Sequence, residues 1–162
     1  MSAADELIEH NVRYADKYDG PRPVIPSRHL TVVTCMDSRM DVHALLGLDL
    51  GEAHVIRNAG GVVTDDVIRS LAISQRRLHT QSVVVIHHTD CGLLNLDEDA
   101  FVAELAAEGT EPPTWRPRSF ADVDADVAEC VAGLRSSPYL KATDDIRGFV
   151  FDVGTGLLRE VA

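Results

Sequence analysis

Short runs of aliphatic and β-branched residues alternate with longer amphipathic segments along this chain, and this alternation limits the folds it can adopt. The runs are apolar along most of their length, which is typical of strands buried on both faces. Strands separated by helices form a mostly parallel sheet. We therefore expect an α/β fold in which a mostly parallel central sheet has helices on both faces. The last two short runs predict an antiparallel hairpin at its C-terminal edge.

The individual elements follow from apolar periodicity and from capping residues. Strands are predicted over residues 29–34, 53–57, 82–87, 146–153 and 157–161. Helices are predicted over residues 3–18, 42–46, 65–78, 97–108 and 120–135. Thr64 is a suitable N-cap for the third helix, and Gly47 ends the second. Ser119 with Asp122 resembles a capping box at the start of the last helix.

Length and charge restrict the organisation and the partners. The 162 residues suit one domain, 1–162, in which residues 1–25 form an N-terminal helix and arm. Lys and Arg total 15 against 26 Asp and Glu, a net charge of −11. That charge argues against nucleic acid and against an anionic membrane surface as partners. No run is long enough to span a membrane, and the first residues do not resemble a signal peptide, so we expect a cytoplasmic protein.

Two clusters of reactive side chains follow the first and third predicted strands. Residues 35–39 read Cys-Met-Asp-Ser-Arg, and residues 87–92 read His-His-Thr-Asp-Cys-Gly. Function in parallel sheets lies beyond the carboxyl ends of the strands, so the two clusters should meet. Cys35, His88 and Cys91 then offer two thiolates and one imidazole, a donor set typical of zinc. Cys130 lies on the apolar face of a predicted helix and is interpreted as a core residue.

Three such ligands leave a fourth position on the metal, which either water or a carboxylate can fill. Asp37 is two residues from Cys35, so on an extended backbone both side chains project to the same face. Arg39 is placed to hold Asp37 in a bidentate pair. Asp37 thus has two alternative partners, the zinc and the guanidinium. Backbone N–H groups near Gly60 and Gly92 are candidates for binding an oxyanion substrate.

The motif Cys35-x-Asp37-Ser38-Arg39, followed by His88-x-x-Cys91-Gly92, resembles the β-class carbonic anhydrases, as does the segment 55–60 between them. The resemblance is to the short actinobacterial members. It implies one zinc per chain on Cys35, His88 and Cys91, with an Asp37–Arg39 dyad beside it. It also implies reversible hydration of carbon dioxide to bicarbonate and a proton by a zinc-bound hydroxide. The family resemblance further implies a homodimer, often paired into a tetramer, with the active cleft at the subunit interface and the N-terminal helix lying on the partner.

Two alternatives to carbonic anhydrase activity remain open. One is hydrolysis of a related heterocumulene, carbon disulfide or carbonyl sulfide. The other is a non-catalytic zinc-binding regulatory protein in which Asp37 closes the metal site. Arg39 argues against the second, because a purely structural site gains little from a group that competes for its ligand. Independently of the family, apolar side chains on the first helix, among them Leu7, Ile8 and Val12, predict that it packs across a two-fold partner.

Overall fold

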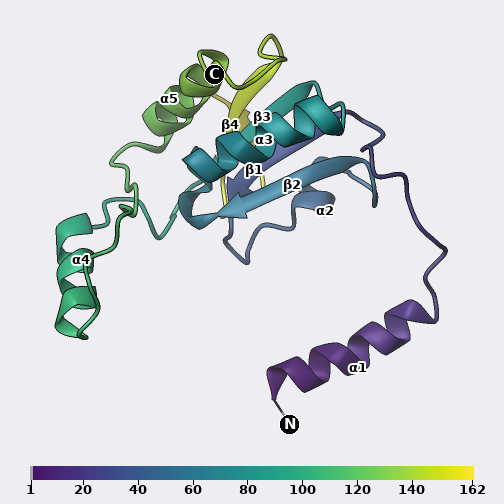
Figure 1. Ribbon diagram of the computed structural model, residues 1–162, viewed down its shortest axis with the longest axis horizontal. Coiled ribbons are helices and arrows are strands. Elements are labelled where there is room, and N and C mark those ends of the chain that lie inside the picture. Colours follow the sequence, from purple (N-terminus) through teal and green to yellow (C-terminus); the bar gives the residue numbers. More distant parts are fainter. Residues whose placement is uncertain (1) are drawn as a thin grey trace.

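The computed structural model describes residues 2–162 as a five-stranded sheet with helices around it (Figure 1). The strands are β1 (Leu30–Cys35), β2 (Ala53–Asn58), β3 (Ser82–His88), β4 (Ile146–Phe151) and β5 (Leu158–Glu160). The helices are α1 (Ala3–Ala15), α2 (Val42–Leu46), α3 (Asp65–Arg77), α4 (Glu98–Ala107) and α5 (Val123–Arg135), and a 3-10 turn, η1, spans Ala59–Gly61. The order across the sheet is β2-β1-β3-β4-β5. The first four strands are parallel and β5 is antiparallel, which confirms the predicted sheet and its edge hairpin.

The register of the three neighbouring strands brings their carboxyl ends together. Thr34 of β1 lies opposite Ile86 of β3, and Cys35 lies opposite Asn58 of β2. The loops that follow β1, β2 and β3 therefore leave the sheet at the same edge. This edge is where the sequence predicted a functional site.

Strand alternation divides the core into two layers. Val33 faces a layer formed with α3 and α5, to which those helices contribute Leu71 and Leu134. Val32 faces the other layer, which includes Val42 of α2 and loop residues. Helices thus cover both faces, as predicted, although the second face carries only the five-residue α2 and loops.

Helices α1 and α4 lie away from the sheet (Figure 1). None of the residues in either helix is fully buried. On α1, Leu7, Ile8 and Val12 are 69%, 66% and 60% exposed. No helix within residues 2–162 combines the length and apolarity needed to cross a membrane.

The last helix begins later than predicted. Ser119 does not cap it; its backbone N–H and hydroxyl instead donate to the carboxylate of Glu98. Asp122 is the N-cap, because its carboxylate accepts the N–H groups of Asp124 and Ala125. The helix therefore begins after Asp122, about one turn beyond Ser119, because Asp122 forms the capping hydrogen bonds.

Two other predicted ends were also too long. The first helix stops at Ala15, three residues before the predicted end, where the chain turns without packing on the sheet. Strand β4 ends at Phe151 because the Asp152 carboxylate accepts the N–H groups of Gly154 and Thr155 and turns the chain. By contrast, Thr64 and Gly47 cap α3 and α2 as predicted, Gly47 with a φ of 62°.

Candidate metal centre

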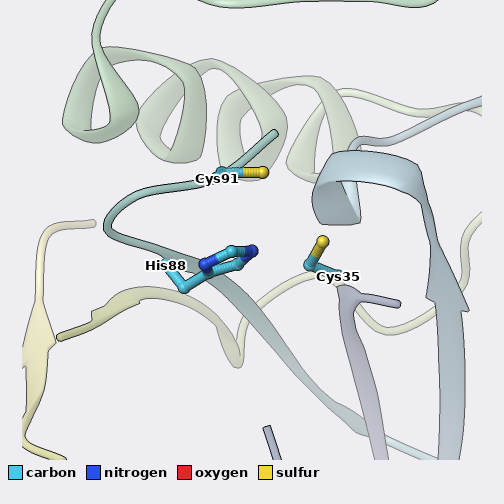
Figure 2. Close-up of side chains that lie close together, drawn as sticks. All are labelled: Cys35, His88 and Cys91. Carbon is cyan, nitrogen blue, oxygen red and sulfur yellow. The ribbon is translucent and has the colours of Figure 1, made fainter. Parts of the chain in front are cut away.

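Three potential metal ligands converge at the carboxyl edge of the sheet. Cys35 is the last residue of β1, His88 is the last residue of β3, and Cys91 follows in the next turn. Their donor atoms all lie within 4.8 Å of one another. Figure 2 shows both sulfur atoms and one ring nitrogen directed into a common space. All three side chains are buried. The cluster is therefore part of the folded interior and not an accidental grouping of surface residues.

The imidazole of His88 is oriented for a metal. Its Nδ1 lies 2.8 Å from the carbonyl oxygen of Thr89, which fixes Nδ1 as the donor and leaves Nε2 as the acceptor. Nε2 is buried and has no hydrogen-bond partner among residues 2–162. A buried polar atom without a partner costs free energy, and a metal ion would remove that cost. The donor set of two thiols and one imidazole therefore fits zinc.

The two thiols are not equivalent. A hydrogen bond from Cys91 lowers the pKa of Cys35 to about 4, and the same contact, together with burial, raises the pKa of Cys91. The backbone N–H groups of Asp37 and Gly60 also lower the pKa of Cys35 and favour its thiolate. Burial lowers the pKa of His88, but the nearby negative charge on Cys35 and the hydrogen bond to the carbonyl of Thr89 outweigh it, so the pKa is raised. Negative charge thus concentrates on Cys35, as a cation ligand requires.

Asp37 lies beside this cluster and is paired with Arg39. The guanidinium donates from Nε to Oδ1 at 2.9 Å and from Nη2 to Oδ2 at 2.7 Å, the bidentate geometry predicted from the spacing. These bonds hold the pKa of Asp37 well below its usual range. Asp37 Oδ2 is still only 3.7 Å from Nε2 of His88. The carboxylate is therefore ionised, fixed by Arg39 and adjacent to the candidate metal position.

Comparison with known proteins identifies the family. The family model described as carbonic anhydrase matches residues 30–111. Beta-carbonic anhydrase 1 of Mycobacterium tuberculosis is 49% identical over 161 residues, 99% of each chain. The chain belongs to the β-carbonic anhydrase family. A solved carbonic anhydrase from Streptococcus mutans covers 100% of this chain and 99% of its own, with a TM-score of 0.93 and 42% identity.

A carbon disulfide hydrolase of Acidithiobacillus thiooxidans is also related to this β-carbonic anhydrase. It is 33% identical, and the alignment covers 82% of this chain and 77% of the hydrolase. The heterocumulene alternative thus has a named relative, at lower identity and lower coverage than the mycobacterial protein.

Arg57 supports the β-carbonic anhydrase site and was not singled out from the sequence. Its guanidinium donates to three backbone carbonyl oxygens: Cys35 at 2.9 Å, Asp37 at 2.6 Å and Met40 at 3.1 Å. One side chain from β2 therefore fixes the backbone of the loop after β1. Hydrogen bonds to backbone carbonyl oxygens do not depend on the identity of the accepting residues, so they produce no sequence motif. Only the position of Arg57 near the end of β2 could have indicated that it supports the loop.

A second cluster lies on the opposite face of β3. Donor atoms of His87, Asp126 and Cys130 also lie within 4.8 Å of one another. However, His87 Nε2 and Asp126 Oδ2 are 2.7 Å apart, a hydrogen-bond distance. Two such ligands on one tetrahedral zinc would stand roughly 3.3 Å apart. Cys130 is buried, which raises its pKa to about 11. We therefore interpret this cluster as a buried hydrogen bond between β3 and α5, which gives His87 a structural role.

The two glycines predicted to contact substrate differ in their surroundings. Gly60 is buried, with a φ of 79°, and its backbone N–H lowers the pKa of the Cys35 thiol. Gly92 is exposed, with no atom within 4 Å of the position a Cβ would take. Their role in binding an oxyanion stays a prediction.

Proposed function

We propose that this protein is a zinc enzyme that interconverts carbon dioxide and bicarbonate, with the metal held by Cys35, His88 and Cys91. The observation that carries the proposal is the unpaired Nε2 of His88, buried among two thiols and next to the Asp37–Arg39 pair. The 49% identity to a β-carbonic anhydrase over 99% of the chain supports the same activity.

Bound zinc would supply Lewis acidity, which lowers the pKa of water towards neutral pH. The protein would contribute orientation and charge. Asp37, kept ionised by Arg39, would accept a hydrogen bond from the reacting water through Oδ2 and orient its lone pair. By holding both carboxylate oxygens, Arg39 would keep Asp37 away from a bound metal. The two cysteines belong to the buried apolar layer on this face of the sheet.

Asp37 has a second possible position, on the metal itself. Its Oδ2 is 3.7 Å from Nε2 of His88, so a small movement would exchange the guanidinium for the zinc. A metal closed in this way would not accept water. The pairing with Arg39 in this structure supports an open site and speaks against the non-catalytic alternative.

Hydrolysis of carbon disulfide is the second candidate activity, because three related hydrolases are 30–33% identical to this chain. Stopped-flow hydration of carbon dioxide and release of sulfide from carbon disulfide, measured on the same zinc-loaded preparation, distinguish the two. We expect fast hydration and negligible sulfide. Sulfide release without hydration would reject the main proposal.

We also propose that residues 1–162 form one domain that assembles as a homodimer, or as a tetramer of two dimers. Residues 1–25, including α1, would pack on the partner subunit. The proposal rests on the exposed apolar side chains of α1, which are not covered by the rest of its own chain. A cytoplasmic location stays a prediction from the sequence, which cell fractionation would test.

A further inference from the structure

Arg39 has a second acidic partner besides Asp37. Its Nη1 donates to Oδ2 of Asp90 at 2.7 Å, and its Nη2 donates to the backbone carbonyl of Asp90 at 2.9 Å. Asp90 belongs to the turn between His88 and Cys91. The guanidinium therefore bridges the loop after β1 and the loop after β3, the two loops that carry the candidate metal ligands.

We propose that Asp90 is a positioning residue of the Asp37–Arg39 pair. It anchors the guanidinium at the turn after β3, where Nε and Nη2 meet Asp37, and so determines how often Asp37 is held away from the metal. This inference rests on the proposed zinc site. It assigns a role to a carboxylate that does not itself touch the metal ligands.

The need for an anchor follows from the exposure of the arginine. The Arg39 side chain is 44% exposed, and a long exposed side chain populates many rotamers in water. Two bonds to Asp37 alone would tie Arg39 only to the carboxylate that it must control. The bonds to Asp90 fix the guanidinium independently of Asp37. They leave it in place when Asp37 moves and favour the return of the carboxylate.

The backbone conformation of Asp90 offers a simpler explanation for the presence of Asp at this position. The test must distinguish that explanation from the proposed ion-pair role. The φ of Asp90 is +55°, in the left-handed region that Asp and Asn tolerate better than most residues. A turn alone would therefore be served equally by Asn. The negative charge at this position is needed only if the ion pair with Arg39 matters. Asp90→Asn keeps the turn and removes the charge, so it isolates the proposed role.

The expected effect is modest, because the Asp90 side chain is 79% exposed and exposed ion pairs are weak. We expect about a two- to fivefold shift between the two positions of Asp37. Asp66→Asn is the matched control. Asp66 forms an exposed ion pair of 2.8 Å with Arg69 on α3, away from the metal centre.

The test uses cobalt-loaded protein at one fixed pH and azide as the probe. Azide must displace Asp37 wherever the carboxylate is on the metal, so its Kd reports the closed fraction. At a pH where the closed state predominates, Asp90→Asn should raise the azide Kd by up to two- to fivefold and shift the cobalt absorption spectrum towards that of Arg39→Ala. Asp90→Gly, which relaxes the turn and removes the side chain, should do at least as much. Asp66→Asn should change neither quantity.

A second readout needs no metal. In the metal-free protein, exchange of the Arg39 Nε proton, followed by NMR, should quicken in Asp90→Asn and not in Asp66→Asn. An unchanged azide Kd and unchanged exchange in Asp90→Asn would overturn the role of Asp90. So would an effect in Asp90→Gly alone, because the turn would then be responsible. Failure of the unmodified protein to bind cobalt would instead reject the metal site, and the inference with it.

Discussion

The amide nitrogen of Cys35 lies only 2.8 Å from the position that a Cβ atom on Gly61 would occupy. The carbonyl carbon of Thr34 and the carbonyl oxygen of Ile86 are almost as close, at 2.9 and 3.2 Å. The turn after β2 thus rests directly on the backbone that presents the first candidate ligand. Because Gly61 also has a φ of +73°, both the space and the conformation at this position require glycine.

Gly61→Ala should therefore destabilise the protein strongly. The left-handed conformation alone costs an L-residue about 1–2 kcal/mol, and the contact with rigid backbone adds to it. We expect the free energy of unfolding in urea to fall by more than about 2 kcal/mol. Gly133→Ala is the control, since Gly133 lies on the exposed face of helix α5 with no atom within 4 Å of the new Cβ. It should stabilise by about 0.5–1 kcal/mol. Equal stability of the two variants would contradict the tight contact.

Zinc content tests the candidate ligands. The unmodified protein should hold one zinc per chain, and Cys91→Ser should lose it together with some thermal stability, because metal binding and folding are linked. Cys130→Ser changes an equally buried thiol outside the cluster and should retain the metal. Elemental analysis after dialysis measures both. Full zinc occupancy in Cys91→Ser would reject the assignment.

The pH dependence of hydration tests the control of Asp37 by Arg39. Hydroxide competes with the carboxylate for the metal, so activity should be low near neutral pH and rise on the alkaline side. Arg39→Ala removes the group that keeps Asp37 ionised and turned away, so hydration should fall by about 10- to 100-fold with the zinc retained. Asp37→Ala should leave the metal open to water at every pH. Hydration by this variant should still be slow, because the carboxylate that orients the reacting water is gone. Wild-type activity of Arg39→Ala across the alkaline range would refute this control.

Sedimentation velocity tests the assembly. Replacing Ile8 and Val12 by Asp places charges on the apolar stripe of α1 and should convert a dimer into monomers at micromolar concentration. His10→Asp, on the opposite side of the same helix, introduces one such charge away from the apolar stripe and should leave the dimer intact. A monomeric unmodified protein would contradict the proposed interface.

Part of the decrease in the free energy of unfolding at acidic pH should come from Glu98. The backbone N–H of Ser119, with Arg116 in addition, lowers the pKa of this carboxylate in the folded protein. A lowered folded-state pKa contributes stability that is present above the unfolded value, about 4.3, and is lost as the pH falls through the folded value. Unmodified protein should therefore exceed Glu98→Gln in urea stability at pH 7, and the difference should vanish in strong acid. Glu104→Gln, on the exposed surface of the same helix, is the control, and an equal loss of stability in that variant would contradict the assignment to Glu98.

Local sequence patterns predicted most of the fold. Apolar runs located all five strands to within two residues at each end, and the caps at Thr64 and Gly47 were read correctly. The start of α5 was wrong because Ser119 and Asp122 compete for the cap, and the contact of Ser119 with Glu98 is invisible in a local window.

The candidate metal ligands were predictable because local sequence patterns also located the ends of the strands that carry them. Cys35, His88 and Cys91 follow strands, and parallel strands bring such residues together. Arg57 and Asp90 act through contacts between segments distant in sequence, and largely through backbone carbonyl oxygens. Those interactions depend on register and loop conformation, which residue types alone do not encode.

Helix α1 has only thirteen residues and buries none of them, although Ser2 and Asp5 close its first turn in a reciprocal capping box. Isolated helices of this length are marginally stable in water, because nucleation is unfavourable and too few backbone hydrogen bonds form to offset it. Its order in solution must then come from whatever surface covers Leu7, Ile8 and Val12. Folding of this segment and association of the subunits would be a single equilibrium, so the helical content of the protein should decrease on dilution.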